Sequence, residues 1–191
     1  MYYFPGFITV LYAYWAYHLS ELKDDMVPEK KVVNVVLVNI GLAELVFLLS
    51  WWFDVFTMGT FGFGQLVLFY IVQDVYFYIV HKFIFHKLLY SVHSRSHDYF
   101  KPYAAWYCHP IEHLVLNIGS IAASFWLFPT SPLVLWFIMV QQIYMSMSKH
   151  RPNSLYYMHH INGNCRFGSF YLTDEIVEYI SCLIERTCKP W

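Results

Sequence analysis

The stretch VVNVVLVNIGLAELVFLLSWWF, residues 32–53, carries Glu44 as its only charged side chain. An α-helix needs about 20 predominantly apolar residues to cross the hydrocarbon core of a bilayer, so this stretch predicts a transmembrane helix. FGFGQLVLFYIVQDVYFYIV, residues 61–80, meets the same requirement. The whole chain agrees, because its 191 residues are 58% hydrophobic and only 13% charged, whereas about a quarter of a soluble domain is charged.

Three shorter apolar stretches extend the predicted membrane domain. Residues 114–128 and 132–148 flank a Pro-Thr-Ser-Pro turn, and their lengths fit a hairpin of two spans or a pair of buried helices. Residues 2–19 are rich in aromatic side chains but lack the basic start and cleavage site of a signal peptide. We therefore predict an all-α fold, a single membrane domain over residues 1–191 with about four to five membrane-embedded helices.

Charged residues predict how this bundle is oriented. All twelve Lys and Arg residues fall in the predicted loops 20–31, 81–113 and 149–191, and none falls in the loops 54–60 and 129–131. The positive-inside rule then assigns the first set of loops to the cytosol. A formal net charge of -1 offers no basic surface for nucleic acid, so no nucleic-acid partner is expected.

The end of the chain predicts one more helix. Residues 174–186 carry apolar side chains at helical spacing. This pattern is typical of an amphipathic helix that packs on the domain or lies in the membrane interface.

Ten histidines are the second unusual feature, and all but His18 lie between residues 81 and 160. Several imidazoles together favour iron, zinc, copper or nickel over magnesium or calcium. The histidine-rich segments 81–113 and 149–174 are thus expected to form a cytosolic metal-binding cap. Isolated interfacial histidines are commonly polar tips at the lipid headgroups, which is the expectation for His18 and His113.

Spacing predicts which histidines could share a metal ion. His93 and His97 lie four residues apart and share one face of a helix. His81 and His86 lie five apart, about 140° from each other on an ideal helix, so they could meet one metal only near a helix end or a distortion. The adjacent His159 and His160 point in different directions and could serve two metals, or one metal and a neighbouring contact.

The order of these motifs resembles the fatty acid hydroxylase/sterol desaturase superfamily of integral-membrane di-iron enzymes. The chain has H-x4-H, H-x3-H, H-P-x-E, a single His after the hairpin, and HH followed by N-x-x-F-G, between about Asp74 and Asp174. HSRSHDYFKP, residues 93–102, is similar to the second histidine box of sphingoid-base hydroxylases. HHINGNCRFGSF, residues 159–170, is similar to the third box of sterol C5-desaturase-like members.

The resemblance implies two non-haem iron ions held mainly by imidazoles, with zinc as a substitute in isolated protein. The implied ligands are His81, His86, His93, His97, His109, His150, His159 and His160. Asp98 could supply an oxygen ligand, and Glu112 and Asp74 are expected to orient imidazoles by accepting their second N–H. Asn164 and Tyr156 are further candidates for ligands or neighbours of the metals.

Two motifs depart from the family pattern. The second box should end in two histidines, and either Ser96 or Asp98 stands in place of one of them, depending on how the spacing is counted. Tyr156 stands where the third box begins with His or Gln. One metal could therefore be held well while the second site is weak.

The resemblance implies O2-dependent hydroxylation or desaturation of a sterol, sphingoid base or fatty acyl chain at the endoplasmic reticulum. It also implies a separate electron donor, cytochrome b5 or an NAD(P)H-linked reductase, because the chain has no haem motif or dinucleotide fingerprint. The motif departures leave a non-catalytic lipid-binding or regulatory relative as the alternative. A zinc-dependent hydrolase is disfavoured because no H-E-x-x-H motif is present.

Overall fold

The computed structural model describes residues 6–19, 29–52, 62–127, 132–151, 154–163 and 165–185. Every regular element in these ranges is helical, and none is a strand. The predicted all-α class is therefore confirmed for the described residues, while the prediction of one domain over residues 1–191 stays a prediction.

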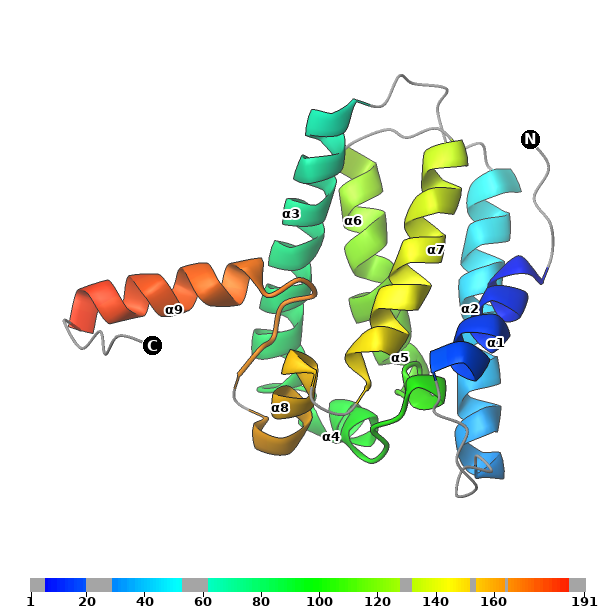
Figure 1. The fold of residues 1–191 in the computed structure, drawn as a ribbon, viewed down its shortest axis with the longest axis horizontal. Coiled ribbons are helices and arrows are strands. Elements are labelled where there is room, and N and C mark those ends of the chain that lie inside the picture. Colours follow the sequence, from blue (N-terminus) through cyan, green and yellow to red (C-terminus); the bar gives the residue numbers. More distant parts are fainter. Residues whose placement is uncertain are drawn as a thin grey trace.

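Four helices form an upright bundle: α2 (Lys30–Trp52), α3 (Phe63–Ile79), α6 (Gly119–Leu127) and α7 (Pro132–Lys149) (Figure 1). The buried residues of α2 recur every three or four positions, which is the spacing of an apolar stripe along one face of a helix. Its members are Val32, Val36, Ile40, Ala43 and Phe47. A matching stripe on α7 belongs to the same core and contains Leu135, Met139, Ile143 and Met147.

Two helical segments, Lys30–Ser50 and Phe63–Phe85, are long and apolar enough to cross a membrane. They correspond to the predicted spans 32–53 and 61–80, although the second one continues beyond Ile79 through a π-helical segment, η1 (Val80–Phe85). Large apolar side chains on the outer face of α2, such as Leu37, Val38 and Leu45, are exposed. Such a surface is what a lipid-facing helix presents.

The predicted hairpin appears with different boundaries. Its first arm is already helical at α5 (Pro110–Glu112) and continues through a second π-helical segment, η4 (His113–Ile118), into α6. Its second arm is α7. Among the described helices, neither arm reaches the length and apolarity of the two candidate spans, so a bundle of four to five spans stays a prediction.

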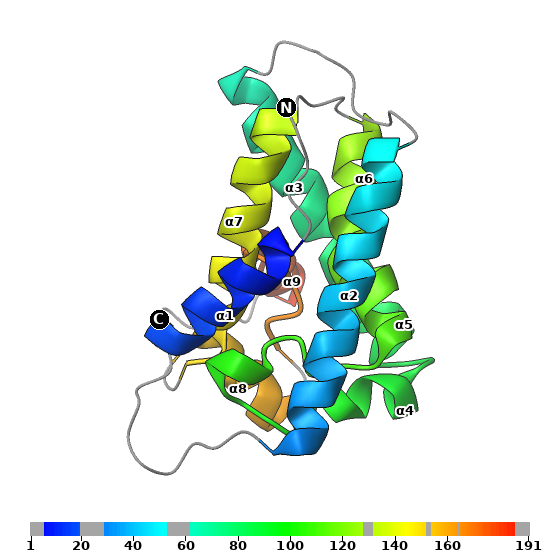
Figure 2. The same cartoon turned by 90° about the vertical axis from the view of Figure 1, so that its right-hand side faces the viewer.

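The predicted span 2–19 is shorter in the structure. Its described part, α1 (Phe7–Leu19), has 13 residues, which corresponds to about 20 Å and is less than the hydrocarbon thickness. α1 lies obliquely against α7 and α2 (Figure 2). The backbone N–H groups of Ile8 and Thr9 donate to Glu44 Oε1 at 2.9 and 3.3 Å. The only charge of the first predicted span therefore caps the start of α1.

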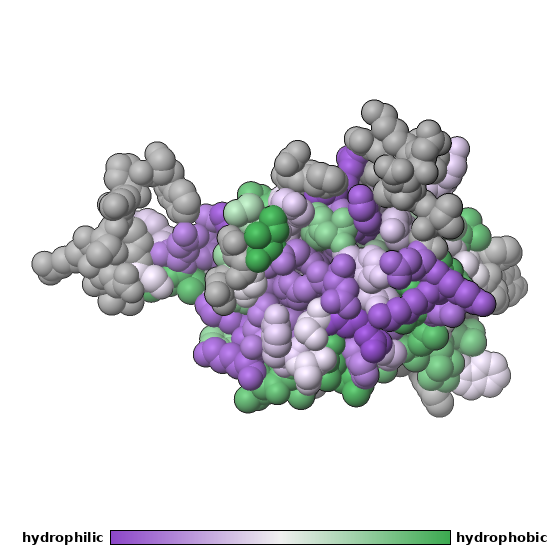
Figure 3. Space-filling view, turned by 90° about the horizontal axis from the view of Figure 1, so that it is seen from below, coloured by the Kyte–Doolittle hydropathy of each residue, from purple (hydrophilic) through white to green (hydrophobic). Residues whose placement is uncertain are grey.

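The histidine-rich segments gather at one end of the bundle. This end carries α4 (Tyr90–His93), α8 (Leu155–Asn162) and the beginning of α2 (Figure 1). Seen from below, much of it is hydrophilic, with hydrophobic residues toward the edges (Figure 3). Lys30, Lys87 and Arg151 are exposed there, which agrees with the predicted two-sided charge distribution. The cytosolic orientation stays a prediction.

The predicted helix 174–186 is α9 (Leu172–Glu185), which extends away from the bundle at a steep angle to α3 (Figure 1). Leu172, Ile176 and Ile180 are exposed on it, whereas Asp174 is buried at its base. An apolar stripe on a helix that lies across the bundle fits either arrangement that the sequence predicts, packing on the domain or lying in the membrane interface.

Candidate metal centre

A widened helical turn brings His81 and His86 together. The His86 N–H donates to the His81 carbonyl oxygen at 2.9 Å, which is the five-residue bond of a π-helix. The two imidazole centroids lie 4.9 Å apart. The distortion that the five-residue spacing demands is therefore present in η1, and both rings face the same side.

Four imidazoles converge at this point, from η1, α4 and α8. The ligand atoms of His81, His86, His93 and His159 all lie within 4.8 Å of one another, and we call these residues the four-histidine cluster. His86 Nε2 lies 2.9 Å from His93 Nε2 and 3.3 Å from His159 Nε2. His81 Nε2 lies 3.2 Å from His93 Nε2.

Backbone carbonyls fix which nitrogen of these rings carries the proton. His81 Nδ1 lies 2.9 Å from the Phe167 carbonyl oxygen, and His159 Nδ1 lies 2.7 Å from that of Cys165. A carbonyl oxygen only accepts, so both Nδ1 atoms donate and both Nε2 atoms present lone pairs to the cluster. Lone pairs that face one another need a cation between them, and a transition metal is the cation that neutral imidazole binds.

Protonated imidazoles do not supply this positive charge. Burial lowers the pKa of His86 to about 3, helped by the neighbouring His93 and His97. Burial also lowers the pKa of His93 to about 4 and that of His159 to about 3. The rings are therefore neutral near pH 7, which is the form that ligates a metal. The donor set fits a transition-metal ion.

Glu112 lies behind His93, as the sequence predicts for a residue that orients an imidazole. Its Oε1 is 2.8 Å from His93 Nδ1, and both side chains are buried. Burial raises the pKa of Glu112, whereas a hydrogen bond with Ser96 lowers it. A carboxylate that accepts the second N–H of a ligating histidine fixes the ring and strengthens it as a ligand.

A second set of rings, which we call the adjacent histidine group, contains His97, His150 and His160. The His97 and His160 centroids are 4.7 Å apart, and those of His150 and His160 are 5.2 Å apart. Both ring nitrogens of His160 are buried without a hydrogen-bond partner. His97 Nε2 lies 3.0 Å from His93 Nε2, which joins this group to the four-histidine cluster. Burial lowers the pKa of His150 to about 4.

Tyr156 lies between the two groups. Its ring stacks on His159 at 5.2 Å with an interplanar angle of 21°. The same ring packs edge-on against His160 at 4.8 Å and His150 at 5.3 Å. The residue that departs from the third-box pattern thus fills the space beside the imidazoles.

The structure does not bring every predicted residue into these groups. His109 Nδ1 accepts a hydrogen bond from the Ile111 N–H at 3.2 Å, so its side chain caps the start of α5. The Asp98 side chain is exposed. Ser96 donates to the His93 carbonyl oxygen at 2.7 Å. Asn164 lies outside the described residues.

His113 differs from its expected place at the headgroups. It is 1% exposed, and its ring lies 4.9 Å from that of Trp106. The helical segment η4, which runs inside the bundle, carries it away from the interface.

Asp74 has a different role from the one predicted. Its carboxylate accepts from the N–H and the hydroxyl of Thr173, both at 2.7 Å, and from the Phe170 N–H, and it is not bonded to a histidine. The sequence pattern placed it near the first histidine box, but α3 directs it to the segment before α9. It therefore holds the segment before α9 against α3.

Asp174 holds the same segment from the other side, a role that the sequence pattern did not predict. Its carboxylate accepts from the N–H of Phe167 at 2.7 Å and of Gly168 at 2.6 Å. A Cβ on Gly168 would lie 2.7 Å from Asp174 and 2.9 Å from Asp74, so only glycine fits between the two carboxylates. We call Asp74, Asp174 and Gly168 the carboxylate clasp. It fixes Phe167, whose carbonyl holds His81.

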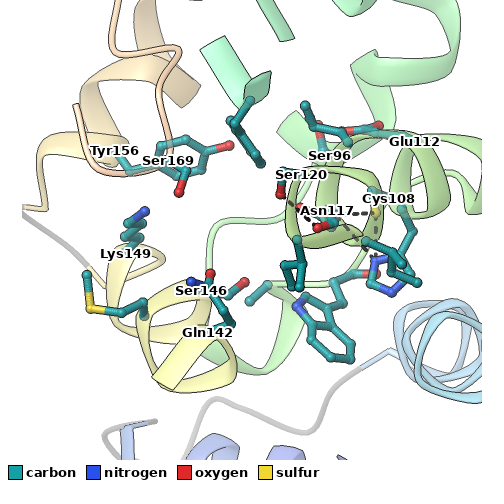
Figure 4. Close-up of a pocket in the computed structure, with 18 of the residues that line it drawn as sticks. Ser96, Cys108, Glu112, Asn117, Ser120, Gln142, Ser146, Lys149, Tyr156 and Ser169 are labelled. Atoms are coloured by element: carbon teal, nitrogen blue, oxygen red, sulfur yellow. Dashed lines mark hydrogen bonds between the residues drawn. The ribbon is translucent and has the colours of Figure 1, made fainter. Parts of the chain in front are cut away.

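A cavity runs from Tyr156 and His160 into the bundle, between α3, η4, α6 and α7. Figure 4 shows Gln142, Ser146 and Lys149 on α7 along one side, with Asn117 and Ser120 on the other. Phe77, Leu116, Ile121 and Met139 supply apolar surface. The cavity therefore connects the interior of the bundle with the adjacent histidine group.

Known proteins are similar in sequence to part of this chain. A Dictyostelium discoideum protein, provisionally named a methylsterol monooxygenase, is 33% identical over 84 residues, which is 42% of this chain and 31% of that protein. Methylsterol monooxygenase 2-2 of Arabidopsis thaliana is 32% identical over 90 residues, covering 46% of this chain and 34% of its own. Human fatty acid hydroxylase domain-containing protein 2 is 32% identical over 107 residues, or 49% and 32% of the two chains.

The chain thus spans about a third of the length of the curated relatives it matches. No family model and no solved structure matches it. The relatives nevertheless agree with the ordered histidine motifs in pointing to one group of proteins. Together with the histidine motifs, these relatives support membership of the chain in the fatty acid hydroxylase/sterol desaturase superfamily.

Proposed function

We propose that this protein is a membrane-bound di-iron oxidoreductase that hydroxylates or desaturates a lipid with O2. The observation that carries the proposal is the convergence of four neutral imidazoles within 4.8 Å. The names of the relatives, methylsterol monooxygenase and fatty acid hydroxylase domain-containing protein, support an oxygenase of lipids. Sterol, sphingoid base and fatty acyl chain are the substrate classes that this proposal covers.

The two histidine groups would hold the two metal ions. The four-histidine cluster binds the first, and His97, His150 and His160 bind the second. Iron, when bound, supplies the reduction of O2 and the oxidation of an unactivated C–H bond. His109 and Asp98 have no part in this assignment, because one caps α5 and the other is exposed.

The chain's own residues position the ligands and exclude water. Glu112 holds the Nδ1 proton of His93, and the Phe167 and Cys165 carbonyls hold those of His81 and His159. Tyr156 packs against the rings and limits the space for water beside them. The apolar part of the cavity holds the lipid close to the adjacent histidine group.

Electrons come from a separate protein, of the cytochrome b5 or NAD(P)H-linked reductase class. It would approach the hydrophilic end of the bundle, where exposed basic side chains lie (Figure 3). We assign this end to the cytosol and the protein to the endoplasmic reticulum membrane. The positive-inside distribution of Lys and Arg supports the orientation.

Metal analysis of anaerobically purified protein tests the proposal. Two irons per folded chain, or zinc after aerobic isolation, is the expected result. His159→Ala should lower metal content and abolish lipid oxidation, and so should His97→Ala, without loss of membrane insertion. A folded protein that binds no metal would refute the proposal and favour the non-catalytic relative.

Two further measurements sharpen the assignment. Tyr156→His restores the family residue and should raise occupancy of the second site if that site is weak. Comparison of lipids from cells with and without the protein should identify the substrate. Unaltered lipids in cells that also supply iron and an electron donor would argue against enzymatic activity.

A further inference from the structure

The cavity wall inside the bundle carries a group of uncharged polar side chains. They come from the four elements α3, η4, α6 and α7, and comprise Gln73, Asn117, Ser120, Gln142 and Ser146. Polar side chains at membrane depth are costly, so they face a partner or a functional space. Two of them, Gln73 on α3 and Gln142 on α7, form a pair that we call the glutamine pair.

The glutamine pair is only half satisfied. Gln142 Nε2 donates to Gln73 Oε1 at 2.9 Å. Among the described residues, this leaves the Gln142 carbonyl oxygen and the Gln73 amide group without a protein partner. Either orientation of the two amides gives the same result. One amide donates to the other, and one C=O and one NH2 are left without a partner. Gln73 is only 2% exposed, so its free group has little access to bulk water, and Gln142 is half-buried.

A hydroxyl group complements this pair. It can donate its hydrogen to the free carbonyl oxygen and accept a hydrogen from the free amide. A charged group would be disfavoured because both glutamines are neutral. The cationic side chain on this wall, Lys149, is seven residues farther along α7, about 10 Å away, and its Nζ lies over the rings of Phe170 and Tyr171.

The position of the glutamine pair suits the far end of a bound lipid. Gln73 precedes His81 by eight residues, and Gln142 precedes His150 by eight. At 1.5 Å per helical residue, both offsets place the pair about 12 Å from the histidines along the bundle axis. The cavity contains the pair as well as Tyr156 and His160.

We propose that the glutamine pair binds the hydroxyl group of a neutral lipid whose oxidised carbon lies at the metal centre, about 12 Å away. This inference rests on the proposed function and narrows its substrate class to lipid alcohols. Sterols and long-chain alcohols share the required chemistry. Unsubstituted acyl chains do not.

Binding to zinc-loaded protein tests the proposal without turnover, because zinc is redox-inert. The protein is placed in phosphatidylcholine nanodiscs, whose lipids have no hydroxyl group. Affinities are measured for cholesterol and its methyl ether, and for 1-octadecanol and its methyl ether. At least one alcohol should bind about tenfold more tightly than its ether, because the ether cannot donate to the free carbonyl oxygen and leaves it unsatisfied. The pair that shows the preference identifies the source of the hydroxyl.

Gln141 provides a matched control for a purely structural role. It also joins α7 to α3, because the Tyr70 hydroxyl donates to its Oε1, but it does not line the cavity. Gln142→Leu should reduce the preference for the alcohol to less than about threefold, whereas Gln141→Leu should retain it. If Gln142→Leu does not fold, Gln142→Met has a similar length without hydrogen-bonding capacity.

Three results would overturn the proposal: equal binding of alcohol and ether by the unaltered protein, an unchanged preference in the Gln142 variant, or equal loss in both variants. None of these results depends on iron content or lipid oxidation. An inactive enzyme that still prefers the alcohol would refute the oxygenase and retain the hydroxyl site. An active enzyme that binds the alcohol and the ether equally would support the oxygenase and refute the hydroxyl site.

Discussion

Replacing Gly168 with alanine would place a methyl group inside the carboxylate clasp. The added Cβ would lie 2.7 Å from Asp174 Oδ2 and 2.9 and 3.2 Å from the two Asp74 oxygens. Ordinary contact begins near 3.4 Å, so the Asp174 oxygen must retreat by 3.4 − 2.7, about 0.7 Å. Its 2.6 Å hydrogen bond from the Gly168 N–H would then exceed 3.2 Å, beyond the usual range for N–H donors.

The free-energy cost follows from the charge of the acceptor. A hydrogen bond to a charged group contributes about 1.5–3 kcal/mol, and overpacking of a buried site adds about 1–3 kcal/mol. We expect Gly168→Ala to lower the free energy of unfolding by about 3 kcal/mol. Because Phe167 moves with the clasp, its carbonyl would also release His81, and metal affinity should fall by about tenfold or more.

Thermal unfolding and zinc titration of the purified protein would measure both effects. A loss of about 3 kcal/mol corresponds to a decrease in Tm of roughly 6–12 °C for a chain of this size. Gly64→Ala is the control, since nothing lies within 4 Å of its added Cβ and alanine favours the α3 helix. Wild-type stability and metal affinity in Gly168→Ala would refute the role of the clasp.

Other residues give independent tests. Glu112→Ala removes the acceptor for the His93 N–H, and zinc titration should show a 10–100-fold weaker site, roughly the range for such partners; unchanged affinity would contradict the pairing. His109→Ala should leave zinc affinity unchanged and cost about 1 kcal/mol of stability as a lost helix cap; a large loss of metal would return His109 to the ligand set. Glu44→Ala should lower Tm by uncapping α1, with metal content intact. Zinc at 100 times its Kd should raise the stability of the apoprotein by about 2.7 kcal/mol, and a chelator should reverse this shift.

Hydropathy predicted the parts of the fold that are long and apolar. The run 32–53 corresponds to α2, because its apolar residues provide both a buried stripe and an outer surface. The short helix α8 escaped prediction, since its eight residues contain two histidines and two tyrosines and no clear apolar period. The length of α1 also escaped, because its start depends on Glu44, which is distant in sequence.

Motif order predicted which residue types meet, but not how they are held. His81, His86, His93 and His159 are all in the predicted set and converge in the structure. The spacing of H-P-x-E could not distinguish a ligand from a helix cap at His109, because imidazole nitrogen serves in both roles. The carbonyls of Phe167 and Cys165 could not be identified at all, since every residue has one.

Asp74 also shows that spacing along the chain does not predict tertiary contacts. A carboxylate seven residues before His81 lies two turns away on the same helix, where it cannot reach that ring directly. Its partners, Phe170 and Thr173, are almost a hundred positions later in the chain. Only tertiary contact could reveal them. Gly168 in the third motif was the available signal, because a glycine between two buried acids indicates close approach.

The π-helical turn at Val80–Phe85 ties ligand geometry to residue count. A standard helix places a pair of ligands on one face at a separation of three or four residues, whereas this turn does so at five. Removing a single residue between His81 and His86 would let the segment relax to ordinary α-helix with the rings still aligned and with α4 still in its rotation relative to α3. Removing a second residue would rotate everything after it by about 100°. The tolerance of this segment to insertions and deletions is therefore set by α4 and His93 downstream. The π-helical turn thus accommodates one extra residue without rotating the histidine-rich end against the bundle.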